Sequence, residues 1–141
     1  IVKNILSAKD AVAYINEFDF SNIEPFTLIL VDWYSNLETY ELVWDGELKF
    51  FTKLKQQPKI WSSSTLYNPE IKQLRKNWFA DWLKQNKNYT QKDILSFHKN
   101  ENLGTAETSP KMKRNFTETV SITSVQKNGE MIDITYLNLL D

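Results

Sequence analysis

The residues best suited to chemistry in this chain are a run of hydroxyls and two arginines. Ser62-Ser63-Ser64-Thr65 follows a short apolar stretch and precedes an expected helix start at Pro69. Hydroxyls in that place either line the mouth of a ligand pocket or satisfy backbone groups of a turn and a helix start. Arg75 and Arg114 leave a similar pair of alternatives open, contact with an anionic ligand or exposure to solvent.

His98 is the only histidine, and the chain contains no cysteine. A histidine at an expected helix end is either solvated and stabilised by the helix dipole, or it is a catalyst. A Ser-His-Asp triad would need it, yet no Gly-x-Ser-x-Gly motif is present. The lack of cysteine excludes disulfides, thiolate zinc sites and a cysteine nucleophile within this chain. We find no metal-ligand spacing and no glycine-rich phosphate loop, so we expect neither metal nor cofactor.

Composition narrows the class of protein further. A chain of 141 residues has the size of one domain, and 17 basic against 18 acidic residues leave a net charge of -1. This balance argues against a nucleic-acid partner held by a strong basic field. The longest aliphatic run, Leu28 to Val31, is far shorter than the roughly 20 residues that span a bilayer. We expect a cytoplasmic protein without a transmembrane segment.

The elements that would position these residues begin with three helices. Ser7, with Asp10 three residues later, predicts the start of a helix that ends near Phe18. Thr90 precedes a short helix that carries Ile94, Leu95 and Phe97. Between them, Asn68 and Pro69 predict the start of a helix that runs to about Gln85.

The helix after Pro69 has an aromatic face. Its apolar stripe consists of Ile71, Leu74, Trp78 and Trp82, widened by Phe79 and Leu83. We therefore expect Trp78 and Trp82 to be core residues. Five tryptophans and an aromatic share of 13% are high for this length, and a ligand pocket is the alternative explanation to a well-filled core.

Strands occupy much of the remaining sequence. The apolar run Phe26–Trp33 predicts a strand buried on both faces. Thr39–Trp44 and Glu47–Leu54 flank Asp45-Gly46, which predicts a two-residue hairpin loop that pairs Val43 with Leu48 and Tyr40 with Phe51. Lys59 to Thr65 predicts a further short strand.

A second hairpin closes the chain. Thr119–Gln126 and Met131–Leu137 flank a turn at 127–130. Ile132, Ile134 and Tyr136 share one face of the hairpin, where they lie across from Thr123 and Val125 of the other strand. The stretch 99–115 is polar and predicts a long loop. This order of elements indicates an α+β fold with mainly antiparallel sheets.

Five segments, in order, resemble the NRDE family, also called the transport and Golgi organisation 2 family, and its bacterial members most closely. The similar segments are Glu24–Asp32, Glu41–Gly46, Ile60–Tyr67, Arg75–Phe79 and Thr119–Ile122. The resemblance runs from about Ile5 to Leu139. It identifies residues 1–141 as the C-terminal portion of a single domain of this family.

The resemblance implies an N-terminal-nucleophile-hydrolase-like αββα sandwich of two antiparallel sheets with helices outside, incomplete in this chain. In that fold a cysteine at the mature N-terminus is the nucleophile and its own amine is the base. That cysteine and the Asn-Arg-Asp-Glu motif precede the part of the family domain that this chain resembles. We therefore expect the intact protein to hydrolyse or bind a small amide or acyl substrate, and this chain alone to be inactive.

The resemblance also implies site residues. Ser62-Ser63-Ser64 is similar to the Ser-Asn-Ser or Thr-Asn-Ser segment of related amidases, and Ser63 stands where their asparagine helps to bind the oxyanion or substrate. Arg114 resembles an arginine that precedes a late hairpin in related proteins. Ser63 and Arg114 are thus the expected supporting residues, and no catalytic residue is expected in this chain. The expected substrate contacts are Trp61, Ser62, Ser63, Ser64 and Arg75.

A non-enzymatic role in trafficking or as a carrier is the alternative. Eukaryotic members of the family are associated with secretory organisation, Golgi structure and haem handling. The candidate haem ligands here would be His98, Met112 and Met131. In either case we expect the strand Phe26–Trp33 to need neighbours from a missing N-terminal segment, so that this chain self-associates or binds that segment as a separate chain.

Overall fold

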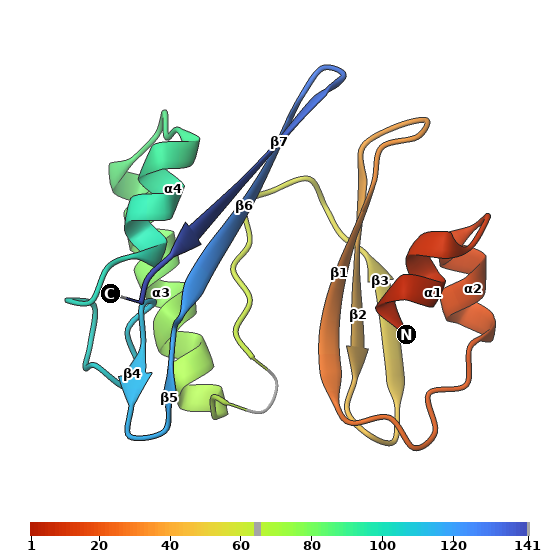
Figure 1. Ribbon diagram of the computed structural model, residues 1–141, viewed down its shortest axis with the longest axis horizontal. Helices are drawn as coiled ribbons and strands as arrows, with labels where there is room; N and C mark the ends of the chain where they lie inside the picture. The colour runs from red at the N-terminus through yellow and green to blue at the C-terminus, as the bar shows by residue number, and fades with distance from the viewer. Residues whose placement is uncertain (64–65, 141) are drawn as a thin grey trace. The chain divides into compact units, whose positions relative to one another are not determined.

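The computed structural model describes residues 1–63 and 66–140. By its internal contacts the chain divides into two compact units, Ile1–Asn68 and Pro69–Asp141. Both units combine helices with antiparallel strands, which confirms the α+β class and the antiparallel sheets (Figure 1). No helix in the described part of the chain is long and apolar enough to cross a bilayer.

The first unit opens with two short helices, α1 (Val2–Ser7) and α2 (Ala11–Glu17). Asp10 is the N-cap of α2, because its side chain accepts a hydrogen bond from the Ala13 N–H at 2.9 Å. The prediction that Ser7 caps this helix was wrong, because Ser7 is the last residue of the preceding helix, α1.

The first unit's sheet has the order β1 (Phe26–Asp32), β2 (Glu38–Trp44) and β3 (Lys49–Lys53) among the described residues. Phe26, Leu28 and Leu30 pack against the core on one face of β1, but the strand is half-buried to exposed along its length, so the predicted burial on both faces was wrong.

The β2–β3 hairpin is real, but its predicted register was wrong. Val43 pairs with Phe50 and Tyr40 with Lys53, two residues further along β3 than expected. The Asp45 side chain accepts the N–H groups of Glu47 and Leu48, so the loop is centred on Gly46-Glu47 and not on Asp45-Gly46. A shift of two residues keeps every side chain on its predicted face.

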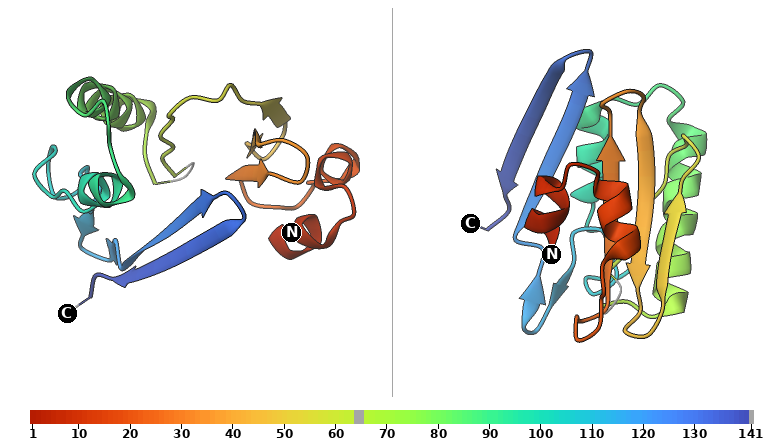
Figure 2. Two further views of the ribbon diagram at one scale, coloured as in Figure 1. Left: turned by 90° about the horizontal axis from the view of Figure 1, so that it is seen from above. Right: turned by 90° about the vertical axis from the view of Figure 1, so that its right-hand side faces the viewer.

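The helices cover one face of this sheet, and the core lies between them (Figure 2). Its buried residues are Ile5, Ile15, Phe20, Leu42 and Trp44. The indole N–H of Trp44 donates to the Ile23 carbonyl at 2.7 Å, so the buried polar atom is satisfied. Residues 59–63 form no strand, in contrast to the prediction.

The second unit begins with α3 (Pro69–Gln85), which has the predicted bounds. None of its described residues is buried: Trp78 and Trp82 are half-buried and Leu74 is exposed. The prediction that the two tryptophans are core residues was therefore wrong in degree. Trp82 instead belongs to a surface-reaching ring cluster, whose other members are Phe79, Tyr89 and Phe97.

Helix α4 (Gln91–His98) starts directly after its N-cap Thr90, as predicted. Thr90 and Asp93 form a reciprocal capping box, and Phe97 is the buried residue of the helix. Strand β4 (Lys113–Arg114) lies within the stretch predicted as a loop, and it forms a small hairpin with β5 (Thr117–Glu118), which follows that stretch.

The last hairpin consists of β6 (Ser121–Asn128) and β7 (Met131–Asn138). Val125 pairs with Ile134 and Thr123 with Tyr136, which confirms the predicted shared face. Contacts with α4, including a 2.9 Å hydrogen bond between Gln91 and Ser124, lie on the opposite face.

Candidate functional site

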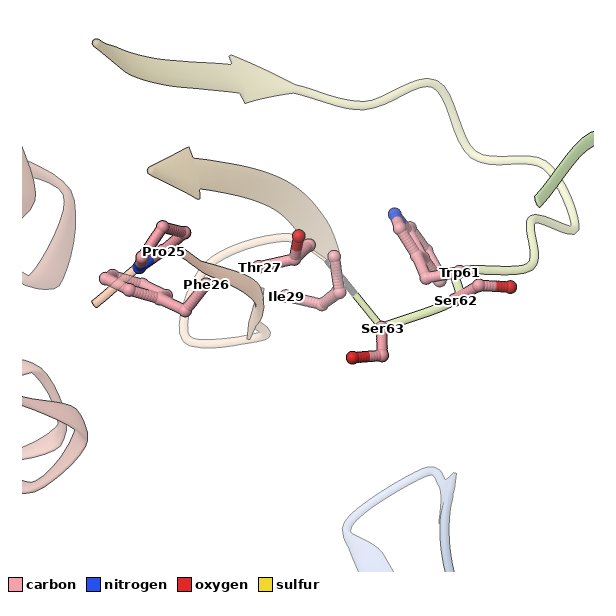
Figure 3. Close-up of a pocket in the computed structure, with 7 residues that line it drawn as sticks. All are labelled: Pro25, Phe26, Thr27, Ile29, Trp61, Ser62 and Ser63. Atoms are coloured by element: carbon pink, nitrogen blue, oxygen red, sulfur yellow. The ribbon is translucent and has the colours of Figure 1, made fainter. Parts of the chain in front are cut away.

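The first unit contains a pocket of about 400 Å³ that is built around the predicted segment after Ile60 (Figure 3). Its lining residues are Pro25, Phe26, Thr27, Ile29, Trp61, Ser62 and Ser63. Strand β1 supplies one wall and the irregular segment 61–63 supplies the other. Three of the five predicted substrate contacts, Trp61, Ser62 and Ser63, thus line one pocket.

Trp61 is held in place by strand β2. Its indole N–H donates to Oε1 of Glu41 at 2.7 Å, while Lys59 Nζ binds the other carboxylate oxygen at 2.7 Å. The Lys59 ammonium also lies 5.2 Å from the centroid of the Trp61 ring. Glu41 pairs with Ile29 of β1, so one cross-strand position supports both walls of the pocket.

The two serines differ in direction and exposure. Figure 3 shows the hydroxyls of Ser62 and Ser63 pointing in opposite directions. Ser63 is exposed and Ser62 is half-buried. The Ser63 oxygen also accepts the Leu66 N–H at 3.3 Å, so this residue both lines the pocket and satisfies a backbone group. Ser63 thus borders a cavity and also satisfies a backbone N–H group.

The remaining predicted site residues lie elsewhere. Ser64 is outside the described residues. Arg75, in the second unit, donates from Nε to the Thr108 carbonyl at 3.0 Å and from a terminal nitrogen to the Ser109 carbonyl. Arg114 donates to the Glu107 carbonyl at 3.3 Å. Neither arginine is among the residues that line the pocket.

The pocket joins an apolar wall to hydroxyl groups. None of its described lining residues is an acid, a base or a cation. The nearby Glu41 is already paired with Lys59 and Trp61, and a serine hydroxyl is a weak nucleophile unless a base activates it. The arrangement suits a neutral ligand with an apolar part and a group that can hydrogen-bond to hydroxyls.

Sequence reasoning missed the wall formed by Pro25, Phe26, Thr27 and Ile29, as well as the support from Glu41. A single sequence carries no signal that β1 lies beside residues 61–63, because that contact joins distant segments. The alternation of β2 places Glu41 on the face opposite Leu42, which is the one local hint.

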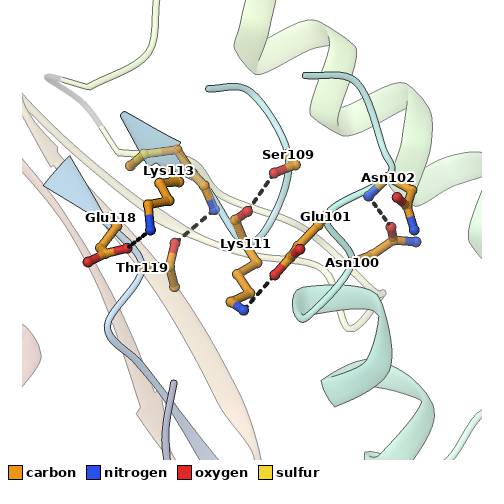
Figure 4. A network of polar contacts seen from close by, with 9 residues as sticks. Asn100, Glu101, Asn102, Ser109, Lys111, Lys113, Glu118 and Thr119 are labelled. Carbon is orange, nitrogen blue, oxygen red and sulfur yellow. Dashed lines mark hydrogen bonds and ion pairs between the residues drawn. The ribbon is translucent and has the colours of Figure 1, made fainter. Parts of the chain in front are cut away.

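A larger cavity, of about 610 Å³, lies in the second unit beside the small β4–β5 hairpin. Figure 4 shows its polar rim, where Lys111 pairs with Glu101 at 2.5 Å and Lys113 with Glu118 at 3.3 Å. The contact with Lys111 lowers the pKa of Glu101. The buried Ser109 donates to the Lys111 carbonyl at 2.6 Å. The four rim charges therefore pair with one another.

His98 is half-buried at the end of α4. Burial, with a smaller contribution from the nearby Arg75 charge, lowers the pKa of the imidazole below its usual 6.5. Of the other candidate haem ligands, Met112 is buried and Met131 is exposed. Within residues 1–63 and 66–140 no three His, Cys, Asp or Glu side chains gather in a metal-binding group.

No protein-family model, curated protein or solved structure matches the chain.

Proposed function

We propose that the pocket around Trp61 and Ser63 binds a small neutral amide or acyl compound. The observation that carries this proposal is the composition of the pocket. The cavity has a volume of about 400 Å³, and the hydroxyls of Thr27, Ser62 and Ser63 border its apolar wall. None of the lining residues that the structure describes is charged. A neutral amide has a polar group that can form hydrogen bonds with these hydroxyls and an apolar part that fits the wall. It carries no charge that would need a partner in the pocket.

The resemblance to the NRDE family extends the proposal to the intact protein. There the chain is the C-terminal portion of an N-terminal-nucleophile-hydrolase-like αββα sandwich, and the nucleophile is a cysteine of a segment that this sequence does not contain. Support comes from the helix-covered antiparallel sheet of the first unit and from the place of Ser63 in the lining. In that protein Ser63 contacts the amide group, while Trp61 contacts its apolar part.

Nuclear magnetic resonance on the 141-residue chain tests the binding step. Hexanamide is the probe, and hexanoate, of the same length but charged, is its comparison. We expect hexanamide to shift the indole N–H signal of Trp61 in a saturable way and hexanoate to bind more weakly, because none of the described lining residues is a cation. Ser63→Ala should weaken binding by about fivefold to tenfold, the value of one hydrogen bond.

Ser7→Ala is the matched control, since Ser7 is an exposed serine of the same unit outside the pocket. Equal binding of the amide and the carboxylate, or an unchanged affinity in the Ser63→Ala protein, would contradict the proposal. Assaying turnover by the intact protein then separates a hydrolase from a carrier, because a carrier binds the amide without cleaving it.

A further inference from the structure

A second ligand-sized pocket, of about 410 Å³, is lined by α3, α4 and the loop that follows α4. Trp78 and Trp82 of α3 and Phe97 of α4 supply its aromatic surface. We call it the tryptophan pocket. Among the described residues, it shares no lining residue with the pocket around Ser63. The two tryptophans are half-buried, so the stripe that the sequence predicts as core borders a cavity.

The aromatic walls are fixed by their neighbours. Phe97 is only 4% exposed, and its ring centroid lies 5.5 Å from that of Trp82. Trp78 rests against the backbone of Gly104, where a Cβ atom would lie 2.5 Å from its Cη2. Only glycine fits this approach, and the positive φ of +82° also favours it. A preformed aromatic surface loses little entropy when a ligand binds.

The electrostatics of the tryptophan pocket favour positive charge. Asp81 is the one ionisable side chain among its described lining residues. Its carboxylate lies 2.8 Å from Lys84 Nζ, but both side chains are more than half exposed, and such pairs contribute little. The faces of aromatic rings carry negative charge density and attract cations. A carboxylate beside three rings therefore complements an organic cation.

Two of the other three polar side chains of the lining, those of Ser96 and Asn100, already have hydrogen-bond partners within the chain, and the third is that of Gln85. The Ser96 hydroxyl donates to the Lys92 carbonyl at 2.9 Å, and the Asn100 side-chain oxygen accepts the Asn102 N–H at 2.7 Å. These two side chains therefore shape the pocket and contribute little to hydrogen bonding with a ligand such as a neutral polyol. Charge and ring contact thus dominate recognition at this pocket.

We propose that the tryptophan pocket binds a small organic cation with a substituted ammonium head group. The head group lies against Trp78 and Trp82, and Asp81 supplies the counter-charge. The cation is either free in solution or the head group of a lipid.

Choline chloride is the probe for the test, with tryptophan fluorescence of the 141-residue chain as the readout and sodium chloride holding the ionic strength constant. The neutral isostere of choline, in which carbon replaces the quaternary nitrogen, is the comparison ligand. We expect saturable quenching by choline and an affinity for the isostere about threefold to tenfold weaker, since cation–π and carboxylate attraction are lost.

Two substitutions on the exposed side of α3 test the counter-charge. Asp81→Asn should weaken choline binding by about threefold to tenfold, and Lys84→Gln should strengthen it because a competing cation is removed. Asp133→Asn, which removes an exposed carboxylate of β7 in the same unit, should leave binding unchanged. The circular dichroism melting curve verifies that each variant is folded.

Equal affinity for choline and the isostere, or unchanged affinity in folded Asp81→Asn protein, would overturn the proposal and leave an ordinary apolar pocket. Vesicles of phosphatidylcholine distinguish the two sources of the cation. Sedimentation of the chain with vesicles, reversed by choline, assigns a lipid head group, whereas binding of choline alone assigns a free cation.

Discussion

Ser63 lines the pocket with a hydroxyl that also accepts the Leu66 N–H. No acid or base among the described lining residues can remove the proton of this hydroxyl. We therefore predict that the purified chain shows no turnover of small amides or esters. A chromogenic anilide and the corresponding nitrophenyl ester are suitable substrates. Turnover that disappears in Ser63→Ala protein would instead demonstrate a serine mechanism.

His98 makes stability depend on pH in a defined direction. Its pKa is lower in the folded chain than its usual 6.5, so the unfolded chain binds more protons near that value. The contribution of His98 therefore favours the folded chain above about pH 7, and it is lost as the pH falls through 6.5, by at most about 1.4 kcal/mol per pH unit. Urea unfolding between about pH 7.5 and 5.5 measures this slope.

His98→Gln is the matched variant because glutamine keeps a polar side chain that does not titrate. We expect its stability to be flatter than that of the parent chain over this interval. The carboxyl groups with lowered pKa, such as Glu101, have usual values near 4.5 and respond mainly below this range. Parallel slopes for the two proteins would show that His98 is not the responsible group.

Gly104, in the loop after α4, lies against Trp78 of α3, so a substitution at Gly104 tests the contact between these two elements. A Cβ there would lie 2.5 Å from Trp78 Cη2 and 2.6 Å from Thr108 Oγ1, whereas a Cβ on Gly129 would meet nothing within 4 Å. Both glycines have positive φ, so alanine costs about 1–2 kcal/mol of backbone strain at either position. We predict that Gly104→Ala destabilises by about 1–3 kcal/mol more than Gly129→Ala.

Thermal or urea unfolding of the two glycine variants measures that difference. The comparison separates the clash from the strain of the backbone, since both substitutions add the same methyl group. Equal destabilisation would mean that the loop at Gly104 moves away from Trp78 at little cost.

The sequence was most informative where an element depends on neighbours along the chain. Helix α3 has its predicted bounds because Pro69 and a local apolar stripe determine them, and Thr90 determines the start of α4 in the same way. The register of β2–β3 was predicted wrongly because the Asp45 side chain binds the turn N–H groups and moves the loop by one residue. Helix α1 was missed because it has six residues and no side-chain cap.

The site was predictable only in part for the same reason. Trp61, Ser62 and Ser63 are consecutive, so they are neighbours in any fold, and all three line one pocket. The partners of Arg75 and Arg114 are carbonyls at residues 107–109. A long loop must satisfy its carbonyls somewhere, but nothing in the pattern of residues says which cation does so.

On the scale of the whole molecule, the β6–β7 hairpin carries an exposed apolar face. Ile134 is 66% exposed, Tyr136 65% and Val125 59%, and Ile132 lies on the same face. The β6–β7 pair forms a sheet of two strands within the described residues, and such sheets have little stability of their own. An apolar face of this kind is typical of a surface that binds another protein surface.

We predict that the chain self-associates at low micromolar concentration through this face, because association removes its apolar side chains from water. Sedimentation velocity should show species heavier than the 16.6 kDa monomer. Ile134→Lys should shift the distribution to monomer, since a lysine in the centre of the face would have to lose its hydration. Gln126→Lys adds the same charge to the opposite face of the hairpin and should leave association unchanged. A monodisperse monomer of the unmodified chain would contradict the prediction, and equal dispersal by both lysine variants would attribute association to net charge instead of this face.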